Sequence, residues 1–152
     1  MTGEFNLAVH ALVFLHRMQQ TVCSDTLARS TCTNPARVRK VMSRLKAAGL
    51  IGAKEGPEGG YYLVRKAQDI TLDMLLDALH IRLVTPTWHS AEADLQCVIA
   101  SGMAGVMDDL LDMLNNSCRE RLGRISILEV DSKIPPMPNK ALHTNLQEQD
   151  IV

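Results

Sequence analysis

With 152 residues, 46% of them hydrophobic and 22% charged, the chain is long enough for one ordinary globular domain and too apolar to be disordered throughout. Its formal net charge of -1 excludes a protein coated in basic surface, so any nucleic-acid face has to be a patch that acids balance elsewhere. No apolar run approaches the length that spans a bilayer, and the N-terminus has no pattern of a secretory leader. The sequence therefore predicts a soluble, cytoplasmic protein with no membrane partner.

Three helices are predicted in the N-terminal part of the chain. A wide apolar stripe marks the first and is formed by Phe5, Val9, Leu12, Val13 and Leu15. Ser24 and Asp25 can cap a short second helix, and Asn34 followed by Pro35 is a start signal for the third. A tight turn would then separate the second helix from the third.

The predicted third helix divides its side chains between two faces. Its buried face is formed by Val38, Val41, Met42 and Leu45. Its outward face carries Ala36, Arg39, Lys40, Ser43 and Arg44. From Leu27 to Lys54 the chain has no acidic residue, although Arg and Lys recur throughout this stretch. Positive charge therefore gathers on one exposed helix face.

A hairpin is predicted directly after this helix. Gly49 ends the helix, and the stretch LIGAKEGPEGGYYLVRK has the pattern of two short strands joined by a turn of Gly and Pro. Helix, turn, helix and hairpin in this order are typical of a winged helix-turn-helix, which we assign to residues 1–82. The fold class is therefore mainly α with a small β-hairpin wing.

The positive helix face suits DNA, because a helix fits the major groove and Arg and Lys reach both base edges and phosphates. The predicted DNA-binding residues are Thr33, Asn34, Arg37, Arg39, Lys40, Ser43, Arg44, Gly59, Gly60 and Tyr61. Two alternatives stay open: the charged face is merely solvated, or the winged helix is a protein-interaction module. An enzyme is not predicted, since the sequence has no nucleophile-base signature, phosphate loop or HExxH pattern.

The second half of the chain is predicted to contain a fourth helix, a connecting loop, a dimerisation helix and a tail. A fourth helix lies in ITLDMLLDALHI, where Thr71 can cap an apolar side, and residues 83–98 form a connecting loop whose Trp88 either packs on the core or lines a ligand pocket. Residues 99–130 form a long helical region that pairs with its symmetry mate. Its stripe consists of Met103, Val106, Leu110, Met113, Leu114 and Ser117. Residues 131–152 are predicted to be a flexible tail.

Three of these stretches, FNLAVHAL, NPARVRKVMSRLKAAGLIGAKEGPEGGYYL and DITLDMLLDAL, resemble the Rrf-two type family of bacterial transcription regulators, which includes IscR, NsrR and CymR. The resemblance covers Phe5 to about Val130. It implies a homodimer, a repressor or activator, that reads a palindromic operator in double-stranded DNA. The chain departs from many relatives at Glu55, where they carry Arg before the first wing glycine, and Glu58 adds a second negative charge.

Cluster-binding members of this family use three closely spaced cysteines before the dimer helix, because an iron-sulfur cluster needs several converging thiolates. That region has only Cys97, and Cys118 lies too far along the helix, so we expect no metal site and no cofactor. Cys23 and His10 are expected to be structural residues.

Cys32 and Cys97 are the predicted redox-sensing thiols. Cys32 precedes the recognition helix near Arg37, and Cys97 precedes the dimer helix; nearby cations and helix N-termini favour thiolates. The resemblance implies that a disulfide between them would join different subunits, as some clusterless members respond through cysteine oxidation. The alternatives are two ordinary packed cysteines, and a regulator that responds to a small molecule or an iron-sulfur effector.

Overall fold

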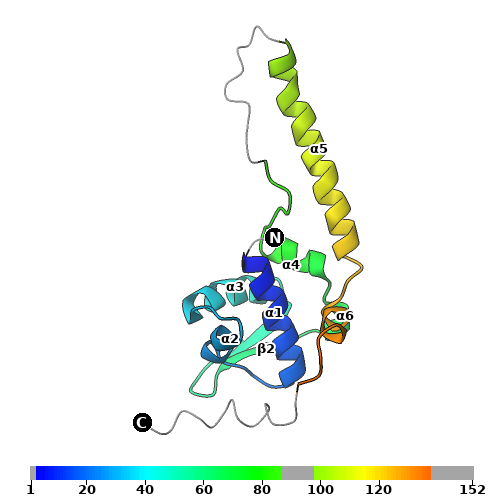
Figure 1. The fold of residues 1–152 in the computed structure, drawn as a ribbon. Coiled ribbons are helices and arrows are strands. Elements are labelled where there is room, and N and C mark those ends of the chain that lie inside the picture. Colours follow the sequence, from blue (N-terminus) through cyan, green and yellow to red (C-terminus); the bar gives the residue numbers. More distant parts are fainter. Residues whose placement is uncertain (1–2, 87–97, 138–152) are drawn as a thin grey trace.

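The computed structural model describes residues 3–86 and 98–137, which form a helical body with one long projecting helix (Figure 1). The elements in chain order are α1 (Gly3–Met18), α2 (Ser24–Ser30), α3 (Pro35–Ala47), β1 (Ile51–Lys54), β2 (Gly60–Leu63), the 3-10 helix η1 (Ala67–Asp69), α4 (Leu72–Ala78), α5 (Val98–Leu122) and α6 (Ile127–Ser132). The predicted fold class, mainly α with a small hairpin wing and a long C-terminal helix, is confirmed.

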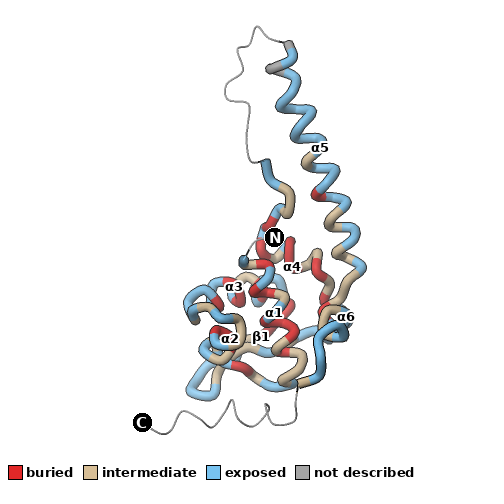
Figure 2. Tube along the Cα trace, in the orientation of Figure 1, coloured by how far each residue is buried: buried red, intermediate tan, exposed pale blue. Residues whose placement is uncertain are grey.

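The core lies inside the body, where α1 crosses α3, α4 and the hairpin (Figure 2). The predicted apolar stripes supply it, because Leu12, Leu45 and Leu75 are completely buried. Val9 is an exception, since it is only half-buried where it borders an open cavity. Ala8 and Ala11, which the stripe did not include, are completely buried instead. Small side chains at these positions let neighbouring elements approach α1 closely.

Helix ends follow local chemistry at α3 but not at α2. The Asn34 side-chain oxygen accepts a 2.8 Å hydrogen bond from the backbone N–H of Arg37, as predicted for an N-cap. Gly49, at a φ of 70°, ends α3, and the N–H of Leu50 donates back to the carbonyl of Leu45 at 3.1 Å. The N-cap of α2 is Cys23 rather than Ser24 or Asp25, because the extended backbone ends one residue earlier.

The two strands pair in an antiparallel hairpin, in which Ile51 lies opposite Leu63 and Lys54 lies opposite Gly60. The hairpin is also tied to the segment between α1 and α2. Val22 and Tyr61 exchange two backbone hydrogen bonds, of 2.9 and 2.8 Å. This short bridge fixes the wing against the body, since an isolated two-stranded hairpin is only marginally stable.

The polar side of α5 is attached to its own chain. Asn115 is 92% buried (8% exposed), and its amide oxygen accepts hydrogen bonds of 3.0 Å from the backbone N–H groups of both Leu83 and Val84. Ion pairs between Arg82 and Asp112, and between Arg119 and Asp77, lie on the same side of the helix. α5 therefore uses its polar residues to hold the segment after α4, and its other side stays uncovered.

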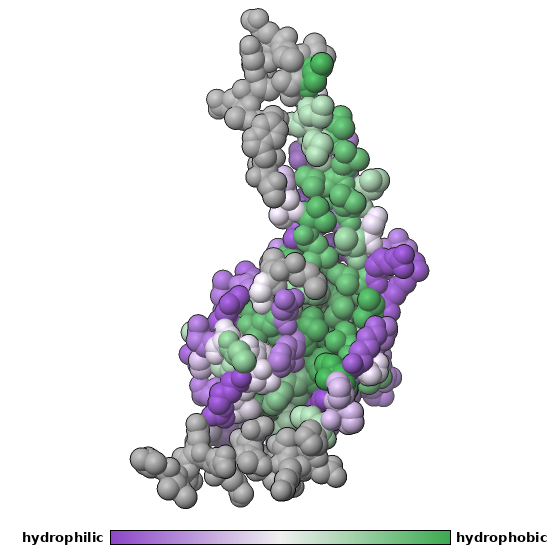
Figure 3. All heavy atoms as spheres, in the orientation of Figure 1, coloured by the Kyte–Doolittle hydropathy of each residue, from purple (hydrophilic) through white to green (hydrophobic). Residues whose placement is uncertain are grey.

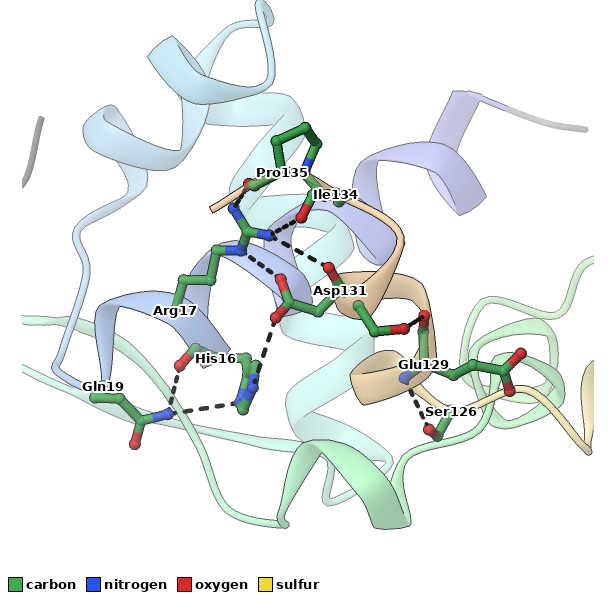
Figure 4. A network of polar contacts seen from close by, with 9 residues as sticks. His16, Arg17, Gln19, Ser126, Glu129, Asp131, Ile134 and Pro135 are labelled. Atoms are coloured by element: carbon green, nitrogen blue, oxygen red, sulfur yellow. Dashed lines mark hydrogen bonds and ion pairs between the residues drawn. The ribbon is translucent and has the colours of Figure 1, made fainter. Parts of the chain in front are cut away.

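After α5 the chain returns to the body, where α6 packs against α1 and Ile127 is completely buried. Arg17 contacts the first residues of the segment that we predicted to be a flexible tail (Figure 4). Its guanidinium group contacts the Asp131 carboxylate and donates 2.9 Å hydrogen bonds to the carbonyls of Ile134 and Pro135. Arg17 thereby satisfies carbonyl groups beyond the end of α6. Residues 138–152 of the predicted tail lie outside the described residues.

Candidate nucleic-acid interface

The two faces of α3 are arranged as the sequence predicts. Val38, Met42 and Leu45 are completely buried, whereas Arg39 and Ser43 are exposed on the opposite side. Lys40 and Ala36 are exposed beside them. The helix therefore presents cations and small polar groups outward while its apolar side anchors it to the core, which is the geometry needed to enter a major groove.

Arg44 lies at the edge of the outward face, and its side chain is partly exposed. Its guanidinium group is half-buried and donates hydrogen bonds of 2.9 Å to the Glu4 carboxylate and 3.3 Å to the backbone carbonyl of Leu79. The reason is its place on the helix circumference, between the outward face and the flank against which α1 and α4 pack. Arg44 ties three helices together.

Glu4 also belongs to this surface, but sequence reasoning missed it because it lies on α1, far from α3 along the chain. Its carboxylate also accepts the Lys40 ammonium at 3.1 Å. The hydrogen bond from Lys40 lowers the pKa of Glu4, the charges of Lys40, Arg44 and Arg37 lower it further, and partial burial opposes them. Glu4 therefore stays ionised beside the basic face.

The turn before α3 holds the remaining predicted residues of the helix-turn-helix. Thr33 is half-buried, and its backbone N–H donates to the carbonyl of Ala28 at 2.9 Å. Asn34 is exposed but uses its side chain as the helix cap. Arg37 is exposed and its guanidinium group lies against Gly3, where a β-carbon would approach it to 2.4 Å. The start of α1 and the start of α3 thus meet at the same surface.

The wing presents its two tyrosines to opposite sides. Tyr61, the predicted contact, is half-buried and packs against the core, whereas Tyr62 is 42% exposed. Burial raises the pKa of Tyr61, and the positive charge of Arg39 partly offsets that rise. Tyr61 therefore lies on the inner side of the wing, near enough to Arg39 to feel its charge. Alternation along the strand makes Tyr62 the outward-facing ring, a residue that we did not predict.

Glycines shape the tip of the wing. A β-carbon at Gly59 would lie 2.5 Å from the carbonyl oxygen of Lys54, and one at Gly60 would lie 2.3 Å from that of Val22. Gly56, at a φ of 105°, takes the left-handed backbone that the turn needs. Glu55 and Glu58 are exposed at this tip, so the wing presents acidic as well as basic groups to any bound DNA.

The described cysteines are separate from one another. Cys32 is exposed in the turn between α2 and α3, where its backbone has a φ of 50°, and Cys118 is half-buried. Cys97, the second predicted redox thiol, lies outside the described residues, as does Trp88. Within residues 3–86 and 98–137, no three His, Cys, Asp or Glu side chains gather to form a metal site.

Cys23, which we expected to be a structural thiol, lies at the N-cap of α2. It is exposed at the start of α2, and its sulfur lies 3.2 Å from the Thr26 hydroxyl oxygen. Partial burial raises its pKa, but hydrogen bonds with the Thr26 hydroxyl and with the backbone of Thr26 and Asp25 outweigh that effect and leave the pKa lowered. Its position directly before a helix was the sequence feature that could have indicated a lowered thiol pKa.

A cavity of about 660 Å³ opens between α1, the end of α5 and the segment after α6. Its walls are mainly apolar, and Val13, Phe14 and Leu122 are among them. At its edge the His10 ring nitrogen lies 2.9 Å from the Ser30 hydroxyl, and burial lowers the pKa of His10. His10 is therefore a hydrogen-bonded neutral side chain at neutral pH, in agreement with a structural role.

A model of the Rrf2 family, described as an iron-dependent transcriptional regulator, matches residues 1–131. The chain belongs to the Rrf2 family. The predicted resemblance is thus confirmed, and transcription regulation through DNA binding is the activity of this family. Among the described helices of this Rrf2 protein, none is long and apolar enough to cross a membrane.

Individual relatives agree with the family assignment. The HTH-type transcriptional regulator YwgB of Bacillus subtilis is 26% identical over 85% of this chain and 90% of its own length. IscR of Pectobacterium atrosepticum is 24% identical over 80% of this chain and 77% of its own. The crystal structure of a transcriptional regulator from Lactobacillus plantarum shares the fold, with a TM-score of 0.72, 24% identity and coverage of 87% and 89% of the two chains.

Proposed function

We propose that this Rrf2 protein is a homodimeric repressor that reads a palindromic operator with α3 and releases it when thiols are oxidised. The main support for DNA reading is the outward face of α3, where Arg39, Lys40 and Ser43 are exposed opposite completely buried apolar residues. Ser43 can hydrogen-bond base edges, and the two cations can pair with guanine or with phosphates. A dimer seated on promoter DNA would exclude RNA polymerase from the same site.

The uncovered side of α5 supports the homodimer. Large apolar side chains follow one another along it, and the space-filling view shows them continuing onto the body (Figure 3). The members are Ile99, Met103, Val106, Met107, Leu110, Met113 and Leu114, each at least 43% exposed. Monomers seldom expose an apolar surface of this extent, so a second α5 is its expected cover.

Replacing Lys40 by Ala is expected to weaken operator binding about tenfold, because a charge-assisted contact to phosphate is worth roughly 1.5 kcal/mol. The operator can be selected from a pool of random duplexes, and affinities measured by fluorescence anisotropy over a range of salt concentrations. Lys133→Ala, which removes an exposed cation at the end of α6, is the control. Unchanged affinity of the Lys40 variant would place the DNA face elsewhere, and absence of any DNA retention by the wild type would favour a protein-interaction module.

The redox part of the proposal rests on the exposure of Cys32 at the turn that leads into α3. A disulfide between Cys32 of one subunit and Cys97 of the other would form when the two thiols lose two electrons and two protons to the oxidant. A disulfide requires the two Cα atoms to lie within about 7 Å, so its formation constrains the turn and the helix that follows. If the disulfide moves α3 in this way, the two recognition helices of the dimer no longer match the fixed spacing of the operator half-sites.

Treatment with diamide is expected to produce a covalent dimer on non-reducing electrophoresis and to release the operator, because diamide accepts the two electrons and two protons of the thiol pair. Cys32→Ser and Cys97→Ser should each abolish both effects, whereas Cys118→Ser should leave them unchanged. A covalent dimer that persists in both of the first two variants contradicts the assignment of these thiols, and so does operator binding that is indifferent to oxidant.

The apolar cavity beside α1 favours a second candidate, in which an apolar small molecule controls DNA binding. Ser30, at the end of α2, lines this cavity, so an occupant would contact the helix-turn-helix directly. The two candidates differ in their response to diamide, which should leave a regulator of the second kind on its operator.

A further inference from the structure

Glu4 supplies both ion pairs that the described acids make with α3. One carboxylate oxygen lies 3.1 Å from the Lys40 ammonium nitrogen, and the other accepts a hydrogen bond of 2.9 Å from Arg44. Carboxylate and phosphate oxygens compete for the same cationic donors. The Glu4 carboxylate therefore occupies a place that a DNA phosphate would otherwise take at Lys40.

The two partners of Glu4 are held differently. Arg44 has a second anchor at the carbonyl of Leu79, and its side chain is 38% exposed. Lys40 is 63% exposed on the outward face, and within the described part of the chain its ion pair is with Glu4. Arg44 thus fixes the carboxylate in position, whereas the flexible Lys40 side chain can leave it. An exposed ion pair of this kind contributes only a small free energy, which a closely seated phosphate can replace but a loosely seated one replaces with little net gain.

We propose that Glu4 is a specificity-determining residue, because it holds Lys40 away from DNA phosphates unless the recognition helix is seated closely on its operator. This inference rests on the proposed function. Non-specific complexes depend on phosphate contacts alone, so they gain little at Lys40 if each contact must first displace Glu4. An operator complex has base contacts that hold α3 close to the duplex, and there the exchange takes place.

The ion pair between Glu4 and Lys40 does not depend on a change of pH. Because the pKa of Glu4 is lowered, its carboxylate is charged throughout the neutral range and becomes protonated only in acid. Asp25 and the wing acids Glu55 and Glu58 also lie near the predicted DNA surface, but none of them pairs with α3 among the described contacts. Glu4 is therefore the residue to test.

Glu4→Gln removes the charge and keeps an oxygen that can accept hydrogen bonds. With a fluorescein-labelled 30-base-pair duplex of unrelated sequence, we expect this variant to bind about 3 to 10 times more tightly than wild type at low salt. The slope of log K against log salt should become steeper by about one, since Lys40 then neutralises one more phosphate. Operator affinity should rise by less than the non-specific affinity, so the ratio of the two falls.

Three comparisons separate this role from a structural one. In a Lys40→Ala background, Glu4→Gln should no longer steepen the salt dependence. Glu129→Gln makes the same change in net charge on α6, where its partner is Lys133, and should leave the slope unchanged. Thermal melting followed by circular dichroism checks that each variant is folded.

An unchanged slope in Glu4→Gln, weaker binding by that variant, or equal steepening in the Lys40→Ala background would each overturn the inference. These outcomes are distinct from a failure of the proposed function, in which wild type and Glu129→Gln would also fail to bind a selected operator.

Discussion

Replacing Leu110 by Asp is expected to convert the protein into a monomer and to weaken operator binding at least about 100-fold, because bivalent attachment of this kind contributes roughly 10² to 10⁴ in avidity. Leu110 lies in the middle of the exposed apolar stripe of α5 and is 43% exposed. A carboxylate there would have to be buried without a partner in a paired α5, which is costly. The fold of the body should survive, since Leu110 is not among the described residues that form the core or pack against it.

The oligomeric state can be measured by sedimentation velocity, and operator affinity by anisotropy. Ala104→Asp is the matched control, because it introduces the same side chain at an exposed position of α5 outside the stripe. It should remain dimeric and bind the operator as wild type does. A Leu110→Asp variant that stays dimeric would show that some other surface forms the dimer.

Replacing Gly60 by Val is expected to lower the free energy of unfolding by about 2 to 4 kcal/mol and to abolish tight operator binding. A β-carbon at this position would lie 2.3 Å from the carbonyl oxygen and 2.4 Å from the carbonyl carbon of Val22. These are backbone atoms, and the same residue exchanges two hydrogen bonds with Tyr61. The wing must therefore separate from the body, and Tyr61 loses its place beside Arg39.

Chemical denaturation gives the free energy, and the selected operator gives the affinity. Gly105→Val is the matched control, because no atom lies within 4 Å of the β-carbon that it would add. That control should change the free energy of unfolding by no more than about 1 kcal/mol. Wild-type stability and DNA affinity in Gly60→Val would mean that the bridge between Val22 and Tyr61 is dispensable.

Local rules were sufficient for the elements and for one face of the site. Asn34 and Pro35 mark the start of α3 in the sequence, and Gly49 marks its end, because capping depends on the chemistry of adjacent residues. The spacing of Val38, Met42 and Leu45 is enough to orient the helix, and it leaves Arg39 and Lys40 outward. These features depend on periodicity along a single helix.

The packing of helices and strands determines which of two similar neighbouring side chains is exposed, and periodicity along the chain does not. Arg44 and Lys40 look equivalent in the sequence, but the flank of α3 against α1 and α4 turns the first inward and leaves the second exposed. Likewise, which of the neighbouring Tyr61 and Tyr62 rings packs against the core and which faces outward depends on the pairing of β2 with Val22. A choice between adjacent, chemically similar residues depends on which face meets the rest of the protein.

Residue types a few positions apart were enough to predict the family, the order of the elements and the apolar and basic faces of α3. The ion pair of Glu4 with Lys40 and the contacts of Arg17 with the segment after α6 became visible in the folded protein alone. Both contacts join side chains from distant parts of the chain. Such a pair forms when the packing of whole helices brings its members together, and no spacing along the chain encodes that distance.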